Sequence, residues 1–85
     1  MFKLQFHSTD RGFVRSDFVD LNGQRCSIQE SSLATEDAIW IGCDEGLHTG
    51  SKCLARMHID QKMALELIEV LQHFVRNGTL PGVHV

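Results

Sequence analysis

Apolar and polar residues alternate in short runs through the first sixty positions, which predicts a set of strands. Residues 2–6 are apolar at every second position, as expected for a half-buried strand. Residues 13–20 are less regular and predict a strand that contains a bulge. The Asn22-Gly23 pair that follows predicts a type I′ hairpin turn. Further strands are expected over residues 24–29, 38–42 and 53–59.

The segment Asp60–Asn77 changes to a period of 3.6 and predicts an amphipathic helix. Asp60 is a suitable N-cap, and Gly78 marks the end of the helix. The apolar residues fill an arc of roughly 160°, whereas an arc of about 100° is enough to cover one sheet. Two explanations stay open. Either the helix also contacts a second surface such as a partner subunit, or a curved sheet wraps it.

Strands followed by one helix predict an α+β fold. We expect a mostly antiparallel sheet of four to five strands, packed with one long C-terminal helix. The 85 residues fit a single domain over 1–85, with strands within 2–59 and the helix over 60–77. A chain this short has a thin stability margin. We therefore expect a homo-oligomer, a dimer or higher, with helix and sheet at the interface.

Charge and cysteine content narrow the function. A net charge of −3 argues against a DNA or RNA binder, but one or two arginines suffice for a small anion. The sequence has no membrane-spanning run and no signal peptide, so a soluble, intracellular protein without a membrane partner is expected. Cys26, Cys43 and Cys53 include no close pair in sequence, which predicts free thiols rather than disulfides.

Neither a metal site nor an active site stands out in the sequence. Cys43, His48, Cys53 and His58 recur every five residues, but structural zinc ligands usually pair at spacings of two to four. The chain has no G-x-S-x-G, P-loop or G-x-G-x-x-G motif. We therefore predict no cofactor and no enzymatic activity. A small hydrolase is the alternative, and it would need a buried His58 or His7 as general base.

Two polar segments are candidates for binding an anion. The first is Arg25–Ser32, where a strand enters a serine-rich loop, and the second is Arg56–His58, just before the helix. An arginine can hold a phosphate through two hydrogen bonds, and a helix N-terminus adds donors. Ordinary structural roles are the alternative. The serines then only cap a turn, Asp60 occupies the helix N-terminus, and Arg56 pairs with Glu30 or Glu36.

The same segments resemble a known family. The string Cys26–Gly42, the motif Arg56-Met-His-Ile59 and the helix through Leu71–Gly78 are similar to a small phage and prophage protein family. We identify this family as the first type of Thoeris anti-defence protein, and the matched strings cover about half of the chain. The resemblance implies a β-sheet with a C-terminal helix. It also implies a non-enzymatic sponge for cyclic ADP-ribose isomers and, in some members, cyclic oligonucleotides.

The resemblance further implies a counter-defence role in the cytoplasm of an infected bacterium, with the ligand bound between subunits of an oligomer. It suggests Arg56 as phosphate clamp and Met57 as base contact, and then, less directly, Gln29, Ser31, Ser32 and Arg25. Typical members carry a longer insertion where this chain has only Cys43–Ala55, which puts a lid over the ligand in doubt. The alternative function is a protein-interaction inhibitor that blocks a host defence complex through its surface.

Overall fold

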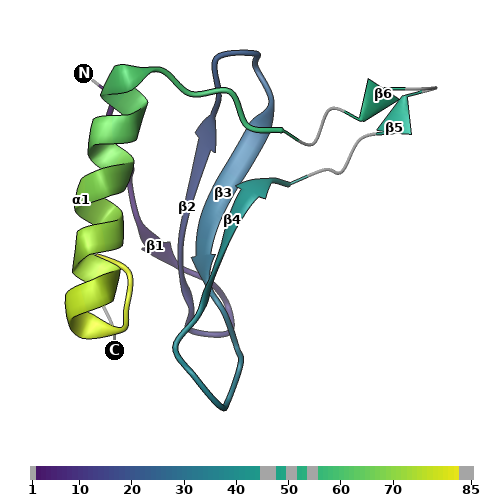
Figure 1. Cartoon of the computed structure of the whole chain (residues 1–85). Coiled ribbons are helices and arrows are strands. Elements are labelled where there is room, and N and C mark those ends of the chain that lie inside the picture. Colours follow the sequence, from purple (N-terminus) through teal and green to yellow (C-terminus); the bar gives the residue numbers. More distant parts are fainter. Residues whose placement is uncertain (1, 45–47, 50–51, 54–55, 83–85) are drawn as a thin grey trace.

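The computed structural model describes residues 2–44, 48–49, 52–53 and 56–82. It confirms the predicted α+β class, with a four-stranded antiparallel sheet in the order β1-β2-β3-β4 and one C-terminal helix, α1 (Figure 1). A separate pair is formed by β5 and β6. The bounds are β1 His7–Ser8, β2 Val14–Val19, β3 Arg25–Glu30, β4 Ile39–Cys43, β5 His48–Thr49, β6 Lys52–Cys53 and α1 Gln61–Asn77.

The helix ends where the sequence predicted. The Asp60 side chain accepts a hydrogen bond of 2.9 Å from the backbone N–H of Met63, which satisfies one of the free donors of the first turn. At the other end Gly78 has a φ of 72° and donates its N–H to the Phe74 carbonyl at 2.7 Å. Because this conformation favours glycine, residue 78 terminates α1.

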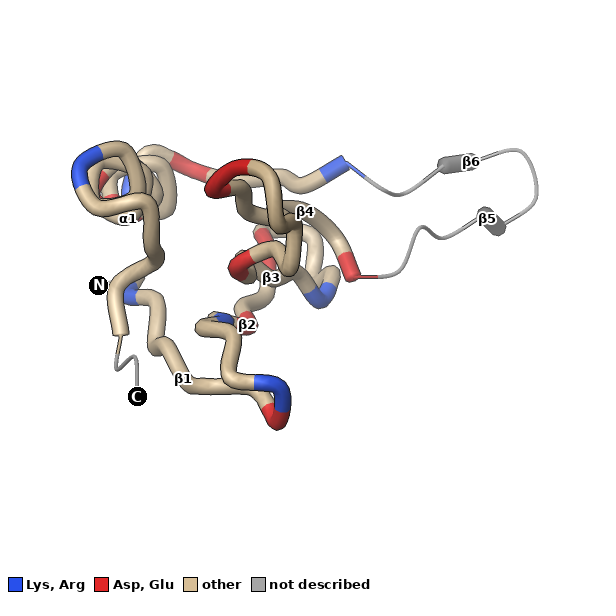
Figure 2. Tube along the Cα trace, turned by 90° about the horizontal axis from the view of Figure 1, so that it is seen from below, with Lys and Arg blue, Asp and Glu red and all other residues tan. Residues whose placement is uncertain are grey.

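The core lies between α1 and one face of the sheet. Figure 2 shows α1 and the amino-terminal segment on the same side of the sheet. On β3, Cys26 and Ile28 are buried on this side, while Ser27 and Gln29 alternate to the outer face. The apolar residues that form the buried cluster are Leu4, Val14, Ile28, Leu67, Val70 and Leu80.

The predicted strand over residues 2–6 is not formed, although its alternation is real. Leu4 is buried, whereas Lys3 and Gln5 are exposed. Instead of joining a strand ladder, the Leu4 N–H donates to the Glu66 carboxylate at 2.7 Å. The segment is therefore extended beside α1, and sheet pairing begins only at His7.

The predicted bulge in the second strand is also wrong. Pairing between β2 and β3 is continuous, from Arg15 opposite Gln29 to Val19 opposite Arg25. The pattern looked irregular because Ser16, a polar residue, occupies a core position with 0% exposure. Val19, an apolar residue, is exposed.

The turn between β2 and β3 is not type I′. That type needs positive φ at both central residues. Here Gly23 has a φ of 79°, whereas Asn22 does not have a positive φ. The Asp20 carboxylate accepts the N–H groups of Asn22 and Gln24, both at 2.9 Å, and so stabilises a longer loop.

The remaining predictions for the first sixty positions are mixed. The strand around Trp40 is confirmed as β4, and the serine-rich segment before it, residues 31–38, contains neither helix nor strand. Part of the strand expected over 53–59 lies outside the described residues, at positions 54 and 55. Residues 56–59 are not a strand.

Ser16→Ala is expected to raise the free energy of unfolding by about 1 kcal/mol, because it removes a buried polar group that has no partner. Among the described residues, the Ser16 hydroxyl is buried without a hydrogen bond. Urea unfolding measures the change. Ser27→Ala is the matched control, because the Ser27 hydroxyl bonds to Asp44 and its loss is not expected to stabilise. A destabilised Ser16→Ala variant would contradict this account of β2.

Candidate functional site

The backbone of segment 56–58 is docked on the loop between β2 and β3 by three hydrogen bonds. The Gln24 side chain donates to the Arg56 carbonyl at 2.9 Å. The His58 N–H donates to the Asp20 carboxylate at 2.9 Å, and the His58 carbonyl accepts the Leu21 N–H at 2.9 Å. The backbone that carries Arg56 is therefore held in place without being part of the sheet.

Asp20 is the residue that organises this end of the molecule. Its buried carboxylate accepts four N–H groups, which come from the backbone of Asn22, Gln24 and His58 and from the Gln24 side chain. Burial by itself disfavours the charged carboxylate. The N–H donors of His58, Gln24 and Asn22 outweigh that effect, so the pKa of Asp20 lies below its ordinary value.

Arg56 is exposed, and its guanidinium forms no ion pair with any described carboxylate. The predicted alternative, a pair with Glu30 or Glu36, is therefore not formed. The Glu30 carboxylate instead accepts the N–H groups of Val14 and Leu80, at 2.9 and 3.0 Å. An arginine without a described acidic neighbour is suited to bind an anion from solution.

The residues beside Arg56 do not include a buried histidine that could act as a general base. Met57 is half-buried, and His58 is exposed with its Nδ1 atom 3.2 Å from the Asn22 side-chain oxygen. His7 is exposed as well, with Nε2 3.7 Å from an Asp17 oxygen. The hydrolase alternative requires His58 or His7 to be buried, and neither is.

The helix N-terminus is already occupied, as one of the sequence alternatives expected. The Asp60 carboxylate accepts the Met63 N–H and places a negative charge at the start of α1. An anion bound there would meet this charge. Arg56, and not the helix dipole, is therefore the main attraction for an anion at this end.

The other predicted binding residues lie at the far end of β3. Gln29 is the fifth residue of β3, and Ser31 and Ser32 follow the strand. The two serines are therefore separated from the β2–β3 turn by six strand residues, which span about 20 Å. Gln29 accepts a hydrogen bond from Arg15 at 2.7 Å, and the Ser31 hydroxyl accepts the Leu33 N–H at 3.1 Å. Ser31 therefore has the capping role that the structural alternative described. Ser32 is exposed.

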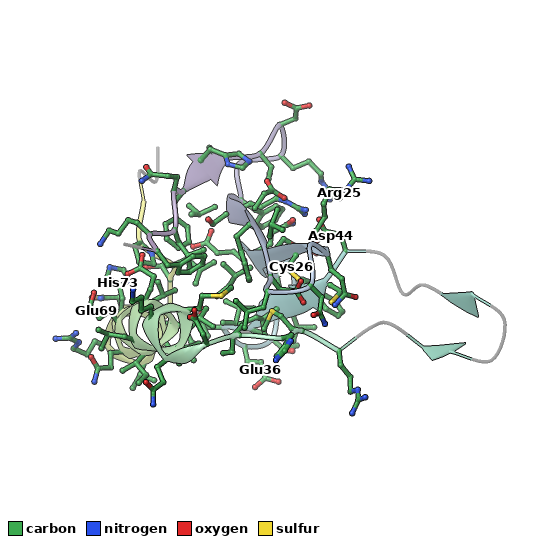
Figure 3. All side chains as sticks on the ribbon, turned by 90° about the horizontal axis from the view of Figure 1, so that it is seen from above. Arg25, Cys26, Glu36, Asp44, Glu69 and His73 are labelled. Atoms are coloured by element: carbon green, nitrogen blue, oxygen red, sulfur yellow. The ribbon has the colours of Figure 1, made fainter. Side chains whose placement is uncertain are left out.

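Arg25 is the one predicted residue from the first segment that lies at the same end as Arg56, since it starts β3 directly after Gln24. Figure 3 shows Arg25 close to Cys26 and Asp44, and away from Glu69 and His73 on α1. Within one chain, the structure therefore brings Arg25, Arg56 and Met57 to one end and leaves the serines at the other.

The outer sheet face carries an ionic network that the sequence did not reveal. Arg15 lies 2.8 Å from an Asp17 oxygen and 3.3 Å from an Asp44 oxygen. The hydrogen bond that Arg15 donates to Asp17, together with the charges of both acids, raises the pKa of Arg15. Because two acids neutralise this arginine, it is a poor receptor for an added anion. Cross-strand register, which periodicity does not fix, brings these residues together.

Two cysteines that are distant in sequence are paired across the sheet. Cys26 on β3 is opposite Cys43 on β4, and their sulfur atoms are 3.7 Å apart. Burial, with added effects from Cys43 and nearby acids, raises the pKa of Cys26 to about 12. The predicted free thiols include this close pair. Of the disfavoured zinc ligands, the His48 and Cys53 side chains lie outside the described residues.

Part of the apolar arc of α1 faces away from the core. Ile68, Leu71 and Val75 are 51%, 38% and 81% exposed, and with Gln72 and Arg76 they line a shallow groove. We call Ile68, Leu71 and Val75 the apolar strip. The explanation that the sheet wraps the whole arc is therefore wrong. On β4, Trp40 is also 69% exposed.

Comparison with protein-family models, curated proteins and solved structures found no match. The resemblance drawn from the sequence strings therefore stays a prediction. In the part of the chain that the structure describes, no helix combines the length and apolar character needed to cross a bilayer.

Asp20→Asn is expected to destabilise the protein at neutral pH, because an amide cannot accept four N–H donors. The pKa of Asp20 is lowered by folding, so the ionised carboxylate stabilises the fold above its unfolded pKa of about 3.9. That contribution is lost as the pH falls through the lower, folded pKa. The gap in melting temperature between the variant and wild type should therefore narrow on acidification.

Thermal unfolding measured from neutral pH to about pH 2 tests this expectation. This range extends from well above to well below the ordinary pKa of a carboxyl group. Asp10→Asn is the matched control, since Asp10 is exposed in the turn after β1. A gap of constant size across the whole range would show that ionised Asp20 does not stabilise this end of the molecule.

Proposed function

We propose that the protein is a non-catalytic sponge that binds and sequesters cyclic nucleotide immune signals, acting as a phage counter-defence protein. The observation that carries the proposal is the state of Arg56. Its guanidinium is exposed and unpaired among the described residues, while its backbone is fixed by bonds to the β2–β3 loop. The resemblance supplies the class of ligand.

Such an arrangement suits a phosphate-bearing ligand. The planar guanidinium offers parallel N–H donors that match two phosphate oxygens. Because the backbone is already ordered, binding loses less conformational entropy than it would on a free loop. Half-buried Met57 is adjacent and provides an apolar contact for a base. A net charge of −3 makes one well-placed arginine more important than general attraction.

The separation of the two predicted segments supports a site shared between subunits. Arg56 and Met57 lie at one end of β3, whereas Ser31 and Ser32 lie beyond the other, about 20 Å away. One chain does not bring both segments to the same small ligand. A second copy can place its serine loop beside the first copy's arginine, which agrees with the interface site that the resemblance implies.

The apolar strip gives that second copy a surface to pack on. Ile68, Leu71 and Val75 are spaced by three and four residues, which is the spacing of a seam between paired helices. A seam of this kind can pair with its own copy about a two-fold axis, so that each chain buries the same residues. We therefore propose that the active unit is at least a dimer.

A second candidate function, inhibition of a host protein complex, is favoured by the exposed apolar residues of α1 and β4. The strip and Trp40 are also suited to contact a host protein, as an interaction inhibitor would. This function needs neither Arg56 nor a nucleotide. Ligand binding separates the two proposals.

Arg56→Ala is expected to weaken ligand binding 10- to 100-fold, because each charge-assisted hydrogen bond contributes about 1.5–3 kcal/mol. The protein is titrated with cyclic ADP-ribose isomers and with cyclic oligonucleotides by calorimetry. It is then heated, and the released ligand is analysed by mass spectrometry. A sponge returns the ligand intact. Arg11→Ala, which removes an equal charge from an exposed position, should bind as wild type does.

Three results would contradict the proposal. If no cyclic nucleotide binds the wild type, the interaction inhibitor becomes the better function. If the released ligand is chemically altered, the protein is an enzyme. If Arg56→Ala and Arg11→Ala bind equally well, Arg56 does not hold the ligand.

Val75→Glu is expected to convert the oligomer to monomers, because it places a charge at the most exposed position of the apolar strip. Native mass spectrometry and light scattering give the subunit number with and without ligand. Gln5→Glu is the control, since it adds the same charge to an exposed position beside α1. A wild-type protein that stays monomeric with ligand bound would exclude a site shared between subunits.

A further inference from the structure

Cys26 and Cys43 occupy directly opposed positions on β3 and β4. The neighbouring pair, Arg25 and Asp44, is joined by a backbone hydrogen bond of 2.9 Å. Hydrogen-bonded and non-hydrogen-bonded pairs alternate along an antiparallel ladder, so the cysteines form a non-hydrogen-bonded pair. Side chains come closest at such pairs, and here the sulfur atoms are 3.7 Å apart.

This geometry is compatible with a covalent link. Opposed residues of a non-hydrogen-bonded pair have Cα atoms about 4.5 Å apart, at the short end of the range that disulfides span. The sulfur atoms need to approach from 3.7 Å to about 2.05 Å, which rotation of the side chains can provide without changing the strand register. The two cysteines also differ in access, because Cys26 is fully buried and Cys43 is half-buried.

A metal ion is a less suitable partner for the pair. An Asp20 carboxylate oxygen lies within 4.8 Å of both sulfur atoms, so three potential metal ligands are close together. Each Asp20 oxygen, however, already accepts two N–H groups and has no lone pair left for a metal. Two Gln24 oxygens also lie nearby: the side-chain amide oxygen is 3.7 Å from the Cys43 sulfur, and the backbone carbonyl oxygen is 3.6 Å from the Cys26 sulfur. Structural zinc sites instead use four ligands, mainly thiolates and imidazoles.

We propose that Cys26 and Cys43 form an oxidisable dithiol, which closes to an intrachain disulfide between β3 and β4 when it meets a peroxide. The half-buried Cys43 reacts first. Its thiolate attacks a peroxide oxygen and becomes a sulfenic acid, while the other oxygen leaves as hydroxide and is protonated to water. The Cys26 sulfur then attacks the Cys43 sulfur and loses its proton as a second water leaves. In sum, two thiols and one hydrogen peroxide give one disulfide and two waters.

The order of the two steps follows from the environment of each sulfur. The raised pKa of Cys26, about 12, keeps this buried thiol protonated at neutral pH. A thiol is a far weaker nucleophile than a thiolate, so Cys26 is the poorer candidate for the first attack on an oxidant. It is suited to the second step, where the reacting sulfur is already its neighbour.

Closing the link would fasten the outermost strand of the sheet. β4 is the last strand in the sheet order and carries exposed Trp40. The disulfide would enclose the chain from residue 26 to 43, which includes the Ser31–Ser32 loop. Constraining a loop of this length in the unfolded chain is expected to raise the melting temperature by roughly 10 °C or more.

The test uses the full chain with Cys53→Ser, so that only the proposed pair remains. The protein is treated with hydrogen peroxide, and its free thiols, intact mass and melting temperature are measured. The expected product has no free thiol, a mass lower by two hydrogen atoms, one chain per molecule and a higher melting temperature. Dithiothreitol should reverse all four changes.

Two further variants test the assigned order of reaction. With both Cys26 and Cys53 replaced by serine, Cys43 should stop at the sulfenic acid and be trapped by dimedone. With Cys43 and Cys53 replaced, buried Cys26 should stay reduced at the same peroxide dose. A faster reaction at Cys26 than at Cys43 would overturn the assignment, and circular dichroism confirms that each variant is folded.

Several results would overturn the dithiol itself. The dithiol is excluded if both thiols of the Cys53→Ser protein stay reduced at a peroxide dose that oxidises free dithiothreitol. It is also excluded if the only disulfide product links two chains. Stoichiometric protection of both thiols by one zinc ion per chain would make the pair a metal site instead. None of these outcomes depends on nucleotide binding, so they leave the proposed function untouched.

Discussion

Carboxylates that accept backbone N–H groups hold the irregular segments of this chain to its sheet and helix. Asp20, Glu30 and Glu66 share this role, and each joins segments that are distant in sequence. A four-stranded sheet with one helix buries only a small apolar cluster, so these bonds compensate for ladder bonds that the irregular segments lack. Apart from the bonds of Asp20 within the β2–β3 loop, the N–H groups that these carboxylates accept belong to Leu4, Val14, His58 and Leu80.

The candidate site depends directly on one of these carboxylates. Asp20 fixes the position of His58, and with it the chain that carries Arg56. The same end of the sheet holds Arg25 and the cysteine pair, so the candidate binding residues and the two thiols lie close together there. On the outer face, by contrast, Arg15 is a poor receptor for an added anion, because it already forms ion pairs with Asp17 and Asp44.

In the proposed oligomer, assembly would connect the candidate site to the helix. The core uses only part of the apolar arc of α1, and the strip left exposed faces solvent in a single chain. Covering it with a second copy would remove apolar surface from water and bring a second Arg56 and a second serine loop into one particle. Under this proposal, the separation of these groups along β3 would be a requirement for shared binding.

Local patterns in the sequence were enough to predict the helix, its two caps, the strands around Ile28 and Trp40, and the α+β class, because each depends on residues within a few positions. The excess width of the helix arc was also readable from the sequence. Only tertiary structure decided that the Leu4 N–H bonds to Glu66 instead of to a strand, and that Ser16 is buried. It also decided that Arg56 lacks an acidic partner among the described residues and that Cys26 meets Cys43. These outcomes depend on strand register and on contacts between residues far apart in the chain, which periodicity does not encode.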